Sequence, residues 1–199
     1  MPADAERAQD AVGAAMRAVD RRGFLPPAQQ RWAAQDRPLA IGHGQTNSQP
    51  STVAAMLRLL QVPRGARVLD VGAGSGWTTA LLAHLVGPDG EVLGLERDAR
   101  LAVWGAANVA AAGMPWASVE RAEAGVLGRP DGGYDRVLVS AAAEQLPRTL
   151  VDQLLPGGRM VVPVRHAMTL VVRDPEGDGF RTSEHGTYSF VPLVEDPPG

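Results

Sequence analysis

From residue 51 onward, short apolar runs alternate with stretches in which apolar residues recur at helical spacing. The pattern predicts strands at 66–71, 91–96, 117–121, 134–140 and 159–164. It predicts helices at 51–60, with Ser51 as N-cap, and at 76–86, 98–112 and 145–155. The continuous apolar runs at 68–71 and 137–140 are typical of parallel strands covered by helices on both faces. We therefore expect a doubly wound, mostly parallel α/β sheet with right-handed crossovers.

The first 50 residues do not follow this alternation. Apolar residues at helical spacing predict a helix from Ala5 to Arg22. The next segment, 23–50, is rich in Pro, Gln and Gly, and we expect it to be irregular apart from a helical turn near 29–34. Long loops in compact domains are usually functional. This segment is therefore a candidate for part of the site.

The end of the chain also changes character. After Pro163 no further helix is expected, and two strands at 169–173 and 187–193, joined by the turn-rich DPEGDG, predict an antiparallel hairpin at one sheet edge. With no internal repeat and no break in composition, we expect one domain over residues 1–199. In it, residues 1–50 form the N-terminal helix and loop, and residues 51–199 form the core.

Composition narrows the classes of function. The formal net charge is −3 and the arginines are scattered, which disfavours nucleic acid as a partner. The chain has no cysteine, so thiolate nucleophiles and Cys-based zinc sites are excluded, and the four histidines show no metal-ligand spacing. No apolar run approaches a membrane span, and the first ten residues, MPADAERAQD, do not resemble a signal peptide. We expect a cytoplasmic protein without a metal or a membrane contact.

The segment at 68–77, VLDVGAGSGW, is the first candidate site. Gly72, Gly74 and Gly76 follow a strand and open a helix, where glycine lets the backbone approach a ligand or adopt positive φ. Glu96 ends the next strand, where its carboxylate can accept from both hydroxyls of a ribose. Dinucleotide folds need the third glycine one residue later, where this chain has Trp77. The spacing instead resembles motif I of Rossmann-like methyltransferases, which bind S-adenosylmethionine; a glycine turn without a ligand is the structural alternative.

The segment at 41–50, IGHGQTNSQP, is the second candidate site, and it resembles the signature IGxGQTxSQP of protein-L-isoaspartate O-methyltransferases. Residues 22–26, RGFLP, resemble that family's R-x-x-F-V-P, and three later segments match its motifs in the correct order: YDRVLVSAAAEQLP, LLPGGRMVVPV and SFVPL. The resemblance covers nearly the whole chain. It implies a Rossmann-like class I methyltransferase fold with a seven-stranded, mostly parallel sheet and an antiparallel C-terminal edge.

The resemblance also implies an activity. The enzyme would be a protein-L-isoaspartate(D-aspartate) O-methyltransferase, which moves a methyl group from S-adenosyl-L-methionine to the free carboxylate of an L-isoaspartyl residue in a damaged protein or peptide. The ester then cyclises to a succinimide, and hydrolysis of the succinimide achieves repair. An ordinary carboxyl has a pKa of about 3.9, so the acceptor is already a nucleophile at neutral pH and no general base is needed. A monomer is expected.

Roles for individual residues follow from the same resemblance. Ser48 holds the position of the family's active-site serine and would orient the acceptor carboxylate, while Gln45, Thr46 and Gln49 would hold the loop or the substrate backbone. The alternative is that Ser48 and Gln49 only cap the helix beginning at Ser51. The residues expected to bind the cofactor are Asp70, Gly72, Ala73, Gly74, Ser75, Gly76, Glu96, Arg97, Glu123, Ala124 and Ser140.

Departures from the family pattern leave the substrate open. Ala122, Glu123 and Ala124 stand where the family has Gly-Asp-Gly, whose acid contacts the adenine amino group. Ser189 replaces the arginine of RFVPL, and Ser140 replaces a threonine. One alternative is methylation of a specific aspartate in a ribosomally made peptide to form an aspartimide. Another is a non-catalytic S-adenosylmethionine-binding module, and an NAD-dependent oxidoreductase is disfavoured by the glycine spacing.

Overall fold

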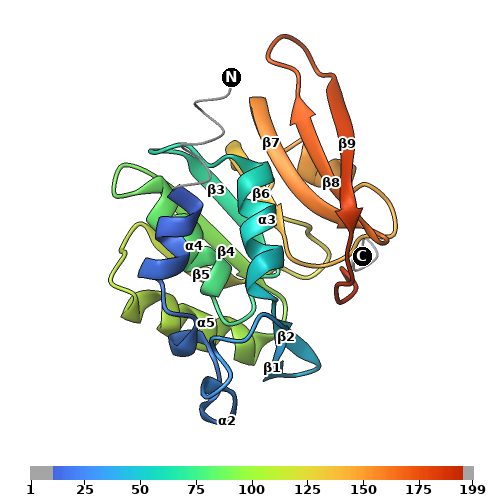
Figure 1. Ribbon diagram of the computed structural model, residues 1–199. Helices are drawn as coiled ribbons and strands as arrows, with labels where there is room; N and C mark the ends of the chain where they lie inside the picture. The colour runs from blue at the N-terminus through green and yellow to red at the C-terminus, as the bar shows by residue number, and fades with distance from the viewer. Residues whose placement is uncertain (1–10, 195–199) are drawn as a thin grey trace.

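The computed structural model describes residues 11–194, which contain a seven-stranded sheet in the order β5-β4-β3-β6-β7-β8-β9 (Figure 1). Neighbours from β5 to β7 are parallel, whereas β8 and β9 are antiparallel to theirs. The strands are β3 (Arg67–Val71), β4 (Glu91–Glu96), β5 (Ala117–Arg121), β6 (Tyr134–Val139), β7 (Leu154–Val164), β8 (Ala167–Arg173) and β9 (Phe180–Thr187). The predicted fold, mostly parallel with an antiparallel C-terminal edge, is confirmed.

Hydrophobic packing divides the core between the two faces of the sheet. Alternate residues of β3 point to opposite faces, so Val68 and Leu69 belong to different core clusters. The first face is covered by the helix at 11–18 and by the longer helices, α3 (Pro50–Leu60), α4 (Trp77–Val86) and α5 (Ala99–Ala111). The second face is covered by α6 (Arg148–Val151) and by connecting segments. Few regular helices therefore protect the second face.

Two predicted elements near the C-terminus are wrong. The helix expected at 145–155 is limited to α6, because Leu154 already pairs with Tyr134 and begins β7. The outer strand is β9, which ends at Thr187, so residues 188–193 lie beyond it and do not form the expected strand. Near the end of β9, Gly186 has a φ of 79° where the register of pairing with β8 shifts. A mostly exposed edge strand carries no apolar alternation, which is why the sequence pattern missed it.

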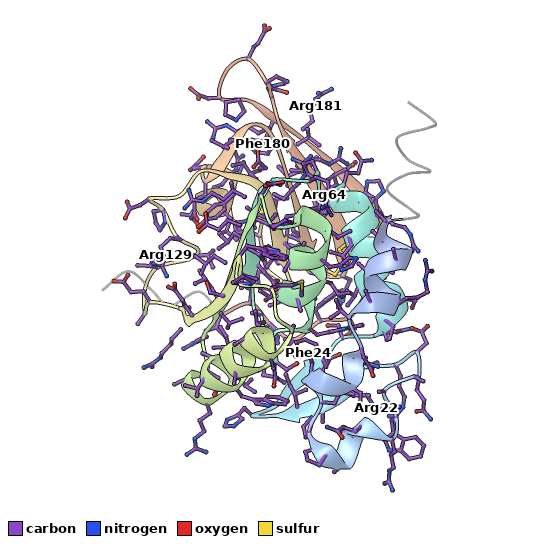
Figure 2. All side chains as sticks on the ribbon, turned by 90° about the vertical axis from the view of Figure 1, so that its left-hand side faces the viewer. Arg22, Phe24, Arg64, Arg129, Phe180 and Arg181 are labelled. Carbon is purple, nitrogen blue, oxygen red and sulfur yellow. The ribbon has the colours of Figure 1, made fainter. Side chains whose placement is uncertain are left out.

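The segment predicted to be irregular contains a small hairpin. Strands β1 (Leu39–Gly42) and β2 (Gln45–Asn47) pair antiparallel, so the candidate loop at 41–50 is largely β-structure. The hairpin turns at Gly42, His43 and Gly44, which all have positive φ. Near it lie the short helices η1 (Arg21–Phe24) and α2 (Pro27–Gln30). Phe24 is buried, and Arg22 and Phe24 lie at the end of the molecule opposite Phe180 and Arg181 (Figure 2).

The N-terminal predictions are only partly within the described range. The helix expected from Ala5 to Arg22 is present at 11–18 and is followed by η1, whereas its first residues lie outside the described part of the chain. The segment MPADAERAQD, which was not expected to be a signal peptide, also lies outside the described residues. At the next helix, α3 begins at Pro50 rather than after an N-cap at Ser51. Proline fits there because the first helical amide needs no intrahelical partner.

Candidate active site

The carboxyl ends of three parallel strands meet at one edge of the sheet. Val71 of β3 is in register with Leu95 of β4 and with Val139 of β6, so the residues that follow these strands are brought together. The amides of Gly72 and Ala73 donate to the Leu95 carbonyl at 2.9 and 3.0 Å. This is the edge at which open α/β sheets bind ligands.

A cavity of about 390 Å³ opens there, within the size range of small-molecule sites. Most residues predicted to form the site line this cavity: Gln45, Thr46, Ser48, Gly72, Ala73, Gly74, Ser75, Glu96, Arg97, Glu123 and Ser140. Three predicted cofactor residues do not line it: Asp70, Gly76 and Ala124. The sequence also missed Asn47, Trp77 and the C-terminal segment at 191–194, which complete parts of the wall.

The glycine turn takes its shape from backbone conformations that other residues rarely adopt. Gly72, Gly74 and Gly76 have φ values of 81°, 55° and 86°. A Cβ at Gly76 would lie 2.7 Å from a methyl of Val109 and 2.9 Å from the Gly105 carbonyl. Gly76 therefore serves the close packing of the turn against α5, while Gly72 and Gly74 face the cavity.

Glu96 is buried at the edge of the cavity, and two backbone amides hold its carboxylate. Oε2 accepts from the Gly74 N–H at 2.8 Å, and Oε1 accepts from the Asp98 N–H at 2.9 Å. A carboxylate oxygen can accept two hydrogen bonds, so each oxygen keeps capacity for a ligand. The fixed carboxylate thus fits two neighbouring hydroxyl groups, as in a ribose. A phosphate would be repelled by it.

Asp70 lies behind the glycine turn rather than in the cavity. Its Oδ2 accepts from the hydroxyls of Thr78 and Thr79 at 2.8 and 2.7 Å, in the first turn of α4. Burial raises the pKa of this carboxyl to about 6. Its Oδ1 is buried and has no hydrogen-bond partner among the described residues. The carboxylate at a helix N-terminus fixes α4 beneath the turn, so its contribution to a ligand is indirect.

The hairpin places Ser48 at the cavity with its hydroxyl free of hydrogen bonds to the described residues. The N-cap position of α3 is Gln49, and no side-chain capping bond comes from it. Instead, the backbone N–H of Ser51 donates to Asp36 Oδ1 at 2.8 Å, and the side-chain Nε2 of Gln49 donates to Asp36 Oδ2 at 3.0 Å. These bonds lower the pKa of Asp36. Gln49 therefore occupies the N-cap position through its backbone alone, Ser48 does not cap the helix, and the side-chain capping bond comes from Asp36.

A second cavity of about 490 Å³ adjoins the first. The two cavities share Thr46, Ser48, Ser140 and Val191. The lining of the second cavity contains no charged side chain; it consists of Pro38, Thr46, Ser48, Gln49, Thr52, Ser140, Thr187, Tyr188, Ser189, Phe190 and Val191. The shared wall therefore presents neutral hydroxyls at the junction between two possible ligands.

The remaining candidates occupy the rim. Glu123 is exposed and lines the first cavity beside Ala122, which follows β5. His43, at the hairpin tip, pairs through Nδ1 with Asp98 Oδ2 at 3.0 Å, and Asp98 also caps α5. Within residues 11–194 no group of three His, Asp or Glu side chains is arranged to hold a metal ion. No helix in the same range is long and apolar enough to cross a membrane.

Arg21, which does not line the cavity, is another residue near the site that the sequence pattern did not predict. Arg21 is buried, with 5% exposure, and the five N–H groups of its guanidinium make six hydrogen bonds, one of them shared, to oxygens of the loop and hairpin around Ser48. The motif R-x-x-F-V-P offered a signal, since its arginine stands three residues before the phenylalanine. Counted back from Phe24, that position is Arg21 and not Arg22.

A glycine turn after β3, an acid at the end of β4 and an antiparallel end to the sheet together define a class I methyltransferase. A family model for protein-L-isoaspartate(D-aspartate) O-methyltransferase (PCMT) matches residues 4–197. The chain therefore belongs to this family, and the resemblance inferred from its motifs is confirmed.

Relatives of known name agree with this assignment. The protein-L-isoaspartate O-methyltransferase of Aeropyrum pernix is 43% identical over 185 residues, which cover 90% of this chain and 71% of the relative. That of Methanopyrus kandleri is 42% identical over 187 residues, covering 92% and 83%. A crystal structure of a Plasmodium falciparum protein-L-isoaspartate O-methyltransferase in complex with S-adenosyl-L-homocysteine superposes with a TM-score of 0.80 at 26% identity. It covers 94% of this chain and 91% of that one.

Proposed function

We propose that this chain transfers a methyl group from S-adenosyl-L-methionine to the free carboxylate of L-isoaspartyl residues in damaged proteins or peptides. The observation that carries the proposal is the wall of hydroxyls from Thr46, Ser48 and Ser140, which two adjoining cavities share. One cavity has the acceptors that a nucleoside needs, and the other is an uncharged groove for a peptide. The enzyme class and the cofactor agree with membership of the family.

The first cavity fits S-adenosylmethionine on the chemistry of its donors and acceptors. Glu96 would accept from the ribose hydroxyls, because the Gly74 and Asp98 amides leave part of each carboxylate oxygen free. Glu123 stands at the rim, where its carboxylate would accept from the adenine amino group. The backbone from Gly72 to Ser75 would pack against the amino-acid portion. When bound, the cofactor would supply the methyl group, carried on a sulfonium.

The second cavity would hold the acceptor. The substrate carboxylate is already the nucleophile, so the residues need to orient it and exclude water rather than remove a proton. The Ser48 hydroxyl is free to donate to it, with Thr46, Ser140 and Gln45 completing the wall. The uncharged lining suits a reaction in which opposite charges disappear, because a drier site favours loss of charge.

The methyl ester would then cyclise to a succinimide as the neighbouring backbone nitrogen displaces methanol, and hydrolysis returns part of the product to normal aspartate. The net result is protein repair. Other expectations from the sequence stay predictions: a single domain divided at residues 1–50 and 51–199, a monomer, a cytoplasmic location, and function without a metal or nucleic acid.

A methylation assay tests the substrate. Two short peptides, identical except for one isoaspartyl or one aspartyl linkage, are incubated with S-adenosylmethionine and followed by mass spectrometry. Methylation or succinimide formation on the isoaspartyl peptide alone supports the proposal. Retained cofactor binding with no product on either peptide would contradict it. That result would favour the aspartimide alternative. Ser189, which stands in the groove where the family has arginine, leaves room for such a substrate.

A further inference from the structure

Arg21 is a buried cation whose hydrogen bonds all go to neutral oxygens, while the Asp36 carboxylate acts on its charge only through space. Its guanidinium donates to the carbonyls of Ala33, Gln35 and Arg37 at 3.4, 3.0 and 2.9 Å, which fixes the loop before β1. Burial lowers the pKa of Arg21 to about 10, so it stays charged at neutral pH. Burying a charge that no carboxylate contacts in a direct hydrogen bond opposes folding, and multiple hydrogen bonds must offset it. Such a group calls for an explanation beyond packing.

Two further bonds of Arg21 act directly on the backbone around Ser48. Nη2 donates to the Asn47 carbonyl at 3.0 Å and to the Ser48 carbonyl at 2.9 Å. These carbonyls belong to the two peptide units on either side of the Ser48 Cα. Because both planes are held by one rigid guanidinium, the direction of the Ser48 side chain is also fixed.

The same guanidinium is linked to the cofactor turn. Its Nε donates to Asn47 Oδ1 at 2.7 Å, and Asn47 Nδ2 donates to Ser75 Oγ at 3.2 Å. The Arg21 guanidinium also lies 5.3 Å from the ring centroid of Trp77, the first residue of α4. One buried group therefore contacts the elements that carry both halves of the site.

We propose that Arg21 is a positioning residue that sets the location of Ser48 relative to the glycine turn. It thereby aligns the acceptor carboxylate with the methyl group. The proposal rests on the function proposed above. Arg21 lines neither cavity, so it acts through Asn47, Ser48 and Ser75 rather than on a ligand.

The first test compares Arg21→Met and Arg21→Lys with the wild-type enzyme. Misplacement of a reacting group by about 1 Å costs about 100-fold in rate, so Arg21→Met should lower kcat by about that factor. Arg21→Lys keeps the charge but not the fork, and its kcat should lie between the two. Affinity for S-adenosylhomocysteine, measured by calorimetry, should change by less than about threefold, because Arg21 does not line the cofactor cavity. Arg22→Met, at the neighbouring exposed arginine, is the matched control and should keep wild-type kcat.

A second measurement does not need turnover. Hydrogen exchange in Arg21→Met should accelerate at residues 45–48 and stay unchanged at residues 80–86, the part of α4 beyond the contact of Arg21 with Trp77. A general loss of structure would accelerate both. Ser75→Ala removes the far end of the link, so its effect on kcat should be less than multiplicative with that of Arg21→Met.

Three results would overturn the proposal: a kcat of Arg21→Met within about threefold of wild type, equal acceleration of exchange in the hairpin and at residues 80–86, or fully multiplicative effects of Arg21→Met and Ser75→Ala. If Arg21→Met does not fold, Arg21→Lys and Asn47→Ala decide the question with the same readouts. An inactive wild-type enzyme would instead count against the isoaspartyl substrate, and exchange and cofactor affinity would still judge Arg21.

Discussion

The carboxylate of Asp36 accepts a 2.8 Å hydrogen bond from the backbone amide of Ser51. An acid from the loop before β1 thus caps helix α3, although it lies 15 residues earlier in the chain. The arrangement leaves the hydroxyl of Ser48, just before the helix, available to the cavity. Structural and catalytic roles are therefore carried by different residues at this turn.

Replacing Asp36 or Ser48 by alanine should separate an effect on stability from an effect on turnover. Asp36→Ala should lower Tm, since α3 loses its cap, whereas Ser48→Ala should leave Tm unchanged. Ser48→Ala should instead lower kcat on the isoaspartyl peptide, with unchanged affinity for S-adenosylhomocysteine. Thermal denaturation, calorimetry and the methylation assay together check the pair. A large drop in Tm, or lost cofactor binding, in Ser48→Ala would show that Ser48 has a structural role.

Removing the Glu96 carboxylate should weaken the cofactor specifically. Charge-assisted hydrogen bonds are worth about 1.5–3 kcal/mol, so Glu96→Ala should lower affinity for S-adenosylhomocysteine by about 10- to 100-fold. Glu96→Gln should also weaken it, because its amide nitrogen must face the N–H of Gly74 or Asp98. Calorimetry measures both. The control is Glu91→Ala, at the exposed start of the same strand; equal affinities for all the variants would rule out the ribose contact.

The parts of the fold that the sequence predicted correctly are those governed by local pattern. Strands β4 and β5 match their expected limits because apolar residues and turn residues bracket them. The glycine turn was recognisable because its backbone needs glycine at fixed spacing. Glu96 followed from it, since parallel register places the end of β4 beside the end of β3.

The parts that the sequence did not predict depend on contacts between distant segments. Arg21 bonds to main-chain oxygens between 12 and 27 residues away, and a carbonyl leaves no mark in the sequence. Asp70 was expected at the cofactor, but its motif does not record that Thr78 and Thr79 would occupy one of its oxygens. The edge strand β9 was missed because its residues are mostly polar and exposed.

Asp70 should give stability an unusual dependence on pH. Its pKa in the folded chain is about 6, above the value of about 3.9 for an unfolded chain. The folded state therefore binds the proton more tightly, and the Asp70 contribution to stability is lost as pH rises from about 4 to about 6. Asp70→Asn removes this contribution, so its stability relative to wild type should improve by about 2–3 kcal/mol between pH 4 and pH 7.

Urea denaturation of the wild type and Asp70→Asn at both pH values measures that difference. Its absolute offset also contains the effect of a buried amide nitrogen at the position of Oδ1, which has no described partner. Only the change of this stability difference with pH reports the titration of Asp70. An identical difference at the two pH values would mean that Asp70 does not titrate in this window.

Two helical glycines should respond in opposite ways to replacement by alanine. At Gly13 in the helix at 11–18, the nearest contact of an added Cβ is 3.4 Å away, at the flexible end of Arg17, so Gly13→Ala should stabilise the protein by up to about 1 kcal/mol. At Gly105 in α5, the Cβ would lie 2.7 Å from the Gly74 carbonyl. Overpacking of this kind costs about 1–3 kcal/mol, which exceeds the gain in helix propensity, so Gly105→Ala should lower Tm. It should also weaken S-adenosylhomocysteine binding in calorimetry, because α5 pushes on the turn that lines the cavity. A Gly105→Ala protein as stable as Gly13→Ala, with wild-type affinity, would mean that the turn yields without affecting the site.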